Sequence, residues 1–241
     1  MPADLDRIGQ GLASSDQGER LAAARTLEAQ FGALVESGAT EWAPLVDRFL
    51  PHLVAGLGDE EKGVQVHCAS CLQFLAYQSD AVLPALRQAL TPPEERRAWG
   101  AAFVAARLGL WSTEVGLALA AAMGAPDRDS RWAAAGHALA LGHSHPDCVQ
   151  VVAGVLHAPS ATARKMAAYC LGAMGEYADV AGALAGRLSD PDRDVRRAVV
   201  LALNRMPRVS PEVRQRVAGM RQDPDEFVRR TADAVARRWG L

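Results

Sequence analysis

The feature of this sequence that most constrains its fold is an internal repeat with a period of about 33 residues. The segments MGAPDRDSRWAAAGHA and LSDPDRDVRRAVVLAL carry Pro-Asp-Arg-Asp-x-Arg at the same offset, and five further segments align with them. The seven copies begin at Leu12, Leu57, Leu90, Met123, Leu156, Leu188 and Arg221. The first step is 45 residues and every later step is 32 or 33. The chain is therefore built from repeated structural units, with an irregular region near its N-terminus.

Each copy predicts two helices joined by a short turn. Asp, Pro, Ser or Gly at the turn supplies caps and turn chemistry, and an alanine-rich segment of about four helical turns follows. A second amphipathic segment lies between successive copies; such segments begin at Asp80, Thr113, Asp179 and Pro211. No segment alternates apolar and polar residues over the length of a strand. The sequence thus predicts an all-α fold.

Turn and helix residues that recur between copies carry a family resemblance. In the copy at Leu188 they are Asp190, Pro191, Val195, Arg196, Ala198 and Leu203, and their counterparts elsewhere are Pro126, Arg131, Ala133, Pro159, Arg164, Ala168, Leu171, Asp223, Pro224, Val228 and Arg229. This pattern resembles the HEAT repeat family, and most closely the short HEAT-like repeats of the phycobilisome-lyase type. The resemblance covers nearly the whole chain and implies a right-handed α-α superhelix, a HEAT-like solenoid of about six to seven helical hairpins. Such families include scaffolds, bilin lyases and an iron hydroxylase, and more distant relatives include alkylpurine DNA glycosylases.

We expect residues 1–241 to form a single HEAT-like domain. Residues 1–56 would be an irregular N-terminal repeat and cap, residues 57–220 the regular repeats, and residues 221–241 a C-terminal capping helix. Within the first part, the segment Glu41–Leu57 predicts one longer helix that bends near Pro51.

Numbering each residue by its distance from the start of its copy aligns the repeats in columns. At 100° per residue, positions 11, 15 and 18 share one side of the second helix. Position 11 holds Ala23, Cys68, Ala101, Ala134, Ala167, Val199 and Ala232, and position 15 holds Leu27, Leu72, Ala105, Ala138, Leu171, Leu203 and Ala236. These small and aliphatic residues predict the core face, which each repeat buries against its neighbours.

Position 8 is rich in arginine, with Arg20, Arg131, Arg164, Arg196 and Arg229. The resemblance to HEAT repeats implies a structural role for them, because an Asp in the turn of a HEAT repeat pairs with this Arg in a neighbouring repeat. Asp190 and Asp223 are available for such pairs.

Positions 9, 13 and 16 lie opposite the core face, so we expect them to face solvent. In HEAT solenoids the second helices line the concave surface, which would here carry Trp99, Phe103, Trp132, Leu139 and Tyr169, continued toward the C-terminus by Lys165, Arg197 and Arg230. Exposed neighbouring aromatics are typical of a binding site. The alternative is that a terminal helix, a second copy of the chain or an error in the helical wheel covers them.

Charge is distributed unevenly along the chain. The whole sequence has a formal net charge of -2, which argues against a strongly basic nucleic-acid binder, but residues 181–241 carry 13 arginines against 8 acidic residues. Arginine favours bidentate pairing with carboxylates, so we expect a protein or peptide partner with an acidic segment. Head-to-tail self-association stays open.

No apolar run is long enough to span a membrane and no signal peptide is evident, so we expect a cytoplasmic protein.

Candidate catalytic and metal-binding residues are few. Cys68 and Cys71 have a spacing that could bind metal, with His143, His145 and Cys148 as further ligands, but both cysteines fall on the predicted core face. The His-Glu pair of the iron hydroxylase relatives is absent. Asp127 and Asp129 near Trp132 resemble the acidic site of the DNA glycosylases, but the same motif recurs at Asp192 and Asp194 and therefore indicates a structural turn.

The sequence accordingly favours non-catalytic protein recognition, with no catalytic residue, metal or cofactor predicted. The chain would act as an interaction module or scaffold, one bacterial version being an immunity protein and another an assembly factor. Two enzyme or ligand-binding alternatives stay open. One is a nucleic-acid binder or glycosylase-like protein that uses the same Trp/Arg groove, and the other is a tetrapyrrole lyase-like or other small-ligand enzyme.

Overall fold

The computed structural model describes residues 2–38, 42–91, 95–175 and 178–241, and these form fourteen α-helices, one 3-10 helix and no strand. The predicted all-α fold is confirmed.

The chain divides into two compact units, Met1–Ala118 and Leu119–Leu241. The first unit holds α1 (Pro2–Leu12), α2 (Gln17–Glu36), α3 (Ala43–Gly56), α4 (Lys62–Ala76), α5 (Val82–Ala89) and α6 (Glu95–Arg107). Helix α7 (Thr113–Ala122) crosses the boundary between the units. The second unit holds α8 (Arg128–Gly142), α9 (Pro146–Val155), α10 (Ala161–Met174), α11 (Ala178–Ala185), α12 (Arg193–Arg205), α13 (Pro211–Gly219), the 3-10 helix η1 (Met220–Gln222) and α14 (Glu226–Arg238).

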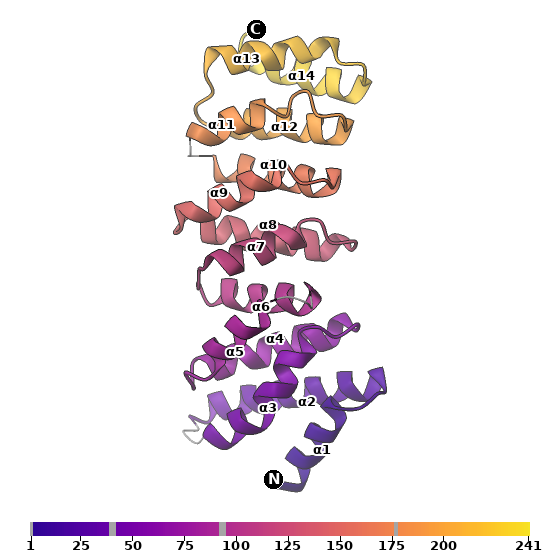
Figure 1. Ribbon diagram of the computed structural model, residues 1–241, viewed down its shortest axis with the longest axis vertical. Helices are drawn as coiled ribbons and strands as arrows, with labels where there is room; N and C mark the ends of the chain where they lie inside the picture. The colour runs from indigo at the N-terminus through magenta and orange to yellow at the C-terminus, as the bar shows by residue number, and fades with distance from the viewer. Residues whose placement is uncertain (1, 39–41, 92–94, 176–177) are drawn as a thin grey trace. The chain divides into compact units, whose positions relative to one another are not determined.

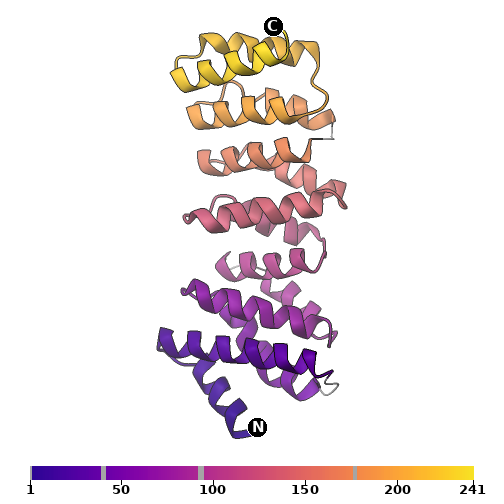
Figure 2. The ribbon, with the colours of Figure 1, turned by 180° about the vertical axis from the view of Figure 1, so that it is seen from behind.

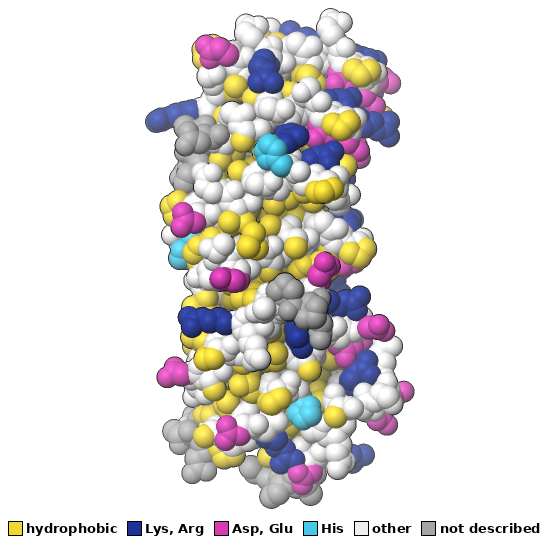
Figure 3. Space-filling view, in the orientation of Figure 1, with side chains coloured by type: hydrophobic (Ala, Val, Ile, Leu, Met, Phe, Trp, Pro, Cys, Tyr) yellow, Lys and Arg dark blue, Asp and Glu magenta, His cyan; other side chains and the backbone are white. Residues whose placement is uncertain are grey.

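Within each unit the helices form consecutive pairs in two layers (Figure 1). In the second unit α8, α10, α12 and α14 lie one beside the next, and α9, α11 and α13 form the other layer. For the second unit, Figure 2 shows the layer of α8, α10, α12 and α14 toward the viewer. Figure 3 shows the opposite face of the second unit, where hydrophobic side chains emerge between scattered charged ones.

The turn residues of the repeat begin the second helices. The Asp127 carboxylate accepts a hydrogen bond from the Ser130 N–H at 2.8 Å, and the Ser160 hydroxyl accepts one from the Ala163 N–H at 3.3 Å. Asp192 and Asp225 cap α12 and α14 in the same way. Because the first N–H groups of a helix have no partner within it, an acceptor three residues earlier fixes where the helix starts.

The core columns are placed as the repeat predicts. Every residue at positions 11 and 15 is buried, from Ala23 and Leu27 to Ala232 and Ala236. Position 18 is buried at Leu75, Leu141, Met174 and Met206, whereas Leu108 and Trp239 are half-buried.

The expectation that position 16 faces solvent is wrong at Ala106 and Gly172, which are buried, and Leu139 there is half-buried. A Cβ on Gly172 would lie only 2.6 Å from the Ala202 Cα of α12. Successive second helices therefore approach closely enough to cover this column, which lies on their mutual contact.

The segment around Pro51 forms one helix, as the sequence predicts, and the expected bend near Pro51 stays a prediction. Glu41 lies outside the described residues, and α3 runs from Ala43 through Pro51 to Gly56 as a single helix. Trp42 precedes it and packs edge-on against Phe31, with ring centroids 5.7 Å apart.

None of the described helices is both long enough and apolar enough to cross a membrane.

Candidate functional site

The second unit exposes a stacked aromatic pair on its second helices. Trp132, in the first turns of α8, is 48% exposed, and its ring stacks on that of Tyr169 from α10 with centroids 5.9 Å apart and planes inclined by 23°. Both residues occupy the columns that lie opposite the core, and both helices are held by buried alanines on their inner faces. An indole and a phenol that face water from rigid helices form a preorganised contact surface.

Basic side chains continue this face along the second unit. Lys165 on α10 lies with its Nζ 3.9 Å from the Asp194 carboxylate. Arg197 on α12 is exposed and has no ion-pair partner among the described residues. Arg230 on α14 is exposed and pairs with Glu226 one turn earlier. Solvated, weakly paired cations of this kind are available to an acidic partner.

A hollow of about 480 Å³ lies between α12 and α14 on the same face. Leu201, Asn204, Arg230 and Ala234 line it with three further residues of α14. The Asn204 Oδ1 atom is buried and has no hydrogen-bond partner within the described chain. Sequence reasoning did not single out Asn204, although it is the one asparagine in the sequence.

The other predicted surface residues are less exposed than Trp132. Trp99 and Phe103 lie on α6 in the first unit and are both half-buried. Leu139 on α8 is half-buried as well. The structure therefore brings Trp132, Tyr169 and Lys165 together on adjacent helices, and it places Trp99 and Phe103 in the other unit.

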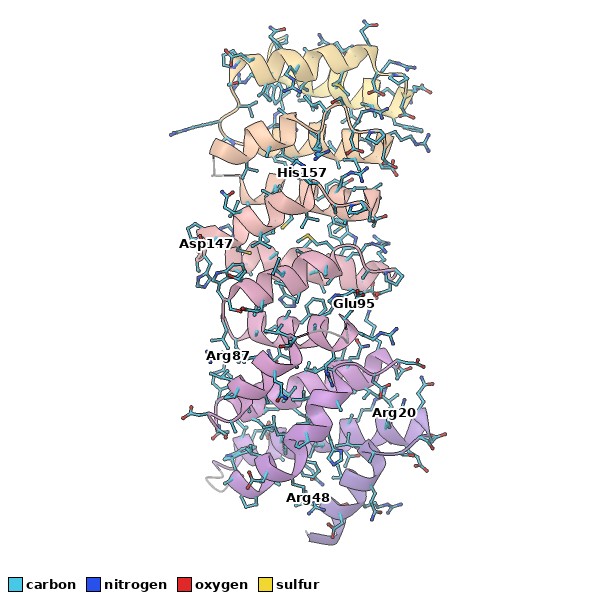
Figure 4. All side chains as sticks on the ribbon, in the orientation of Figure 1. Arg20, Arg48, Arg87, Glu95, Asp147 and His157 are labelled. Atoms are coloured by element: carbon cyan, nitrogen blue, oxygen red, sulfur yellow. The ribbon has the colours of Figure 1, made fainter. Side chains whose placement is uncertain are left out.

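The arginines of position 8 form ion pairs between consecutive repeats, and we call each Arg–Asp pair a rung. Arg164 contacts Asp190 through Nε and Nη2, both at 2.8 Å, and Arg196 contacts Asp223 with the same two distances. Arg20, labelled in Figure 4, reaches Asp59 at 2.6 and 3.1 Å. The resemblance implied the two pairs formed by Asp190 and Asp223, and these rungs have the bidentate geometry that makes Arg–carboxylate pairs strong.

The rungs hold their carboxylates in the charged form. Burial raises the pKa of Asp190, but the hydrogen bonds from Arg164 and from the Asp192 N–H outweigh it, so that the pKa of Asp190 lies below its ordinary value. For Asp223 the hydrogen bond from Arg196 is the largest cause, and its pKa is lowered too. These arginines are occupied within the fold and are not free to bind a partner.

Of the candidate metal ligands, Cys68, Cys71 and Cys148 lie in the core, whereas His143 is exposed and His145 is half-buried. Cys68 and Cys71 are fully buried, and burial raises the pKa of the Cys68 thiol to about 12, with the pKa of Cys71 raised as well. A buried neutral thiol behaves as a small apolar side chain. Within the part of the chain that is described, no three His, Cys, Asp or Glu side chains are grouped so as to hold a metal ion.

Comparison with known proteins identifies the repeat. The family model of HEAT repeats matches residues 117–204, which confirms the resemblance there. No curated protein matches the chain. Among solved structures, YibA from Escherichia coli is 18% identical, with a TM-score of 0.53 over 82% of this chain and 74% of that protein. At this identity the likeness shows the fold alone.

Two other solved structures align over almost the whole chain with lower TM-scores. Human deoxyhypusine hydroxylase in complex with glycerol is 20% identical over 99% of this chain and 96% of that one, with a TM-score of 0.42. A designed armadillo repeat protein in complex with the peptide (KR)4 is 16% identical over 97% and 98%, with a TM-score of 0.43.

Proposed function

We propose that this chain is a non-catalytic recognition module that binds a protein or peptide on the outward face of its second helices. Trp132 and Tyr169, both in the second unit, are the anchors of this surface. The observation that carries the proposal is the stacked Trp132–Tyr169 pair, in which Trp132 stays 48% exposed and Tyr169 is half-buried although both helices bury alanines on their inner faces. Large exposed aromatics on a rigid surface dominate the energy of protein interfaces.

The chemistry of the partner follows from the charges beside this pair. Lys165, Arg197 and Arg230 lie on successive second helices and are only weakly paired. They favour a partner with an acidic segment, whose approach they would steer and whose orientation they would fix. An immunity factor and an assembly factor are two kinds of module that this proposal covers.

The test is capture of a partner by the purified full-length protein, followed by measurement of its affinity by calorimetry with the identified partner. Trp132→Ala should weaken binding at least tenfold, because loss of a central aromatic anchor typically costs about 2 kcal/mol or more. Phe227→Ala is the matched control, since Phe227 is 56% exposed but lies outside the proposed surface. Equal affinity for both variants would reject the surface.

The same experiment separates the nucleic-acid alternative. Binding to DNA rests on phosphate neutralisation and weakens steeply as salt rises. Retention of one protein at two salt concentrations supports the proposal, whereas recovery of nucleic acid that elutes with salt supports the alternative.

A further inference from the structure

The three filled rungs share one set of contacts. In each, the arginine Nη1 donates to two carbonyls of its own turn, as Arg164 does to Ala158 and Pro159 at 3.0 and 2.9 Å. Its Nε and Nη2 hold the aspartate of the next turn, and that aspartate also accepts the N–H two residues later. In the Asp190 rung this last contact comes from the Asp192 N–H at 3.0 Å. The carboxylate thus has three donors supplied by two repeats.

One rung in the second unit has its donors but no carboxylate. The Nη1 of Arg131 donates to the carbonyls of Ala125 and Pro126, both at 2.7 Å, so its guanidinium is anchored as in the filled rungs. The position of the aspartate in the next turn is occupied by Ala158. Among the described residues, neither the Nε and Nη2 of Arg131 nor the N–H of Ser160 has a hydrogen-bond partner. We call this arrangement the open rung.

The open rung is accessible. Arg131 and Ala158 are half-buried and Pro159 is exposed, whereas the side chains of Arg164 and Asp190 in the filled rung are 10% and 0% exposed. Alanine lacks only the carboxylate group of aspartate, so a carboxylate bound from outside would take the place that the Asp190 carboxylate has in the filled rung. Arg presents a planar fork that fits such a group in a bidentate manner.

We propose that Arg131 and the Ser160 N–H form a carboxylate-binding site over Ala158. Its ligand is a carboxylate, supplied either by an aspartate or glutamate side chain of a bound polypeptide or by a small free carboxylate. The site does not depend on the proposed function, because the filled rungs define its donors. A polypeptide ligand would give the second unit a specific contact for an acidic side chain.

Nuclear magnetic resonance of the full-length protein tests this site through the Nε–H of Arg131 and the N–H of Ser160. The probes are sodium acetate against sodium chloride at matched ionic strength, and the peptide acetyl-Ala-Glu-Ala-amide against its glutamine counterpart. Saturable shifts of these two signals, with the Nε–H signals of Arg164 and Arg196 unmoved, are the expected result. If both acetate and the glutamate peptide shift the two signals, the ligand of the site is an acidic side chain of a polypeptide. If acetate alone shifts them, the ligand is a small free carboxylate.

Ala158→Asp provides the matched variant, because it supplies the missing carboxylate from within the chain. It should abolish the acetate shifts and raise the melting temperature by about 2 to 4 °C. Arg131→Lys, which keeps the charge but removes the fork, should abolish the shift at Ser160 and gives a second test should Ala158→Asp fail to fold. The absence of saturable shifts in the wild-type protein, or their persistence in both variants, overturns the proposal.

Discussion

At the scale of single residues, neighbouring arginines in this protein have opposite roles. Arg196 and Arg197 are adjacent in sequence, but they project from α12 about 100° apart. Arg196 is bound to Asp223 and nearly buried, while Arg197 is exposed. The direction of the side chain, and not its charge, decides whether an arginine stabilises the stack or is available to a partner.

We expect Arg196→Ala to lower the free energy of unfolding by about 3 kcal/mol, because the substitution leaves the carboxylate of Asp223 buried and unpaired. Urea unfolding measures the loss. Arg197→Ala is the control and should change stability by less than about 0.5 kcal/mol. Equal effects of the two substitutions would contradict the structural role of the rung.

Trp132→Ala should cost less than about 1.5 kcal/mol of stability, since removal of a fully buried Trp costs about 3–5 kcal/mol and half of this side chain faces water. The loss consists mainly of the stacking on Tyr169. Thermal unfolding checks this value, and a loss of several kcal/mol would show that Trp132 is a core residue and remove it from the binding surface.

At the scale of helices, the distance between successive second helices depends on small residues. Gly172 in α10 lies against the backbone of Ala202 in α12, where a Cβ would be 2.6 Å from its Cα. Gly136 in α8 has open space around the place of a Cβ, with no heavy atom within 4 Å. One glycine therefore permits close packing, and the other only reduces helix propensity.

This difference predicts effects of opposite sign for the same substitution. Gly172→Ala should lower the free energy of unfolding by about 1–3 kcal/mol through overpacking. Gly136→Ala should raise it by about 0.5–1 kcal/mol, because alanine is the better helix former. Chemical denaturation of both variants beside the wild type decides the matter, and destabilisation by both would mean that packing does not distinguish the two sites.

At the scale of the whole molecule, the rungs couple stability to pH. Asp59, Asp190 and Asp223 all have pKa values lowered in the folded state, whereas an unfolded aspartate titrates near pH 3.9. A carboxylate with a lowered folded pKa contributes its full stability above the unfolded pKa and loses it as pH falls through the folded pKa. Acid should therefore weaken the contacts between repeats in both units.

We expect the free energy of unfolding to fall steadily below about pH 4 as the three carboxylates are protonated. The variant Asp190→Asn/Asp223→Asn should be less stable at neutral pH and should show a shallower dependence on pH. Denaturant unfolding at a series of pH values measures both slopes. Parallel curves for wild type and variant would show that other groups govern acid unfolding.

The helix pairs, the starts of the second helices and the buried columns at positions 11 and 15 could all be predicted from the amino-acid sequence. These properties follow from local periodicity and from capping residues such as Asp192 and Ser160, which act within one or two turns of chain. The HEAT-like character of residues 117–204 was recognisable from the same pattern.

Which of the outward residues meet water depends on the packing of neighbouring helices and could not be predicted from the sequence. A helical wheel gives the direction of a side chain on one helix, but its exposure depends on how closely the next helix approaches. That distance is set by pairs such as Gly172 and Ala202, which are 30 residues apart in sequence. For this reason the sequence misplaced Ala106 and Gly172 and did not reveal the stacking of Trp132 on Tyr169. The open rung at Arg131 could not be found from the sequence either. The missing carboxylate becomes evident only when the hydrogen-bond donors around Ala158 are compared with those that hold Asp190 and Asp223 in the filled rungs.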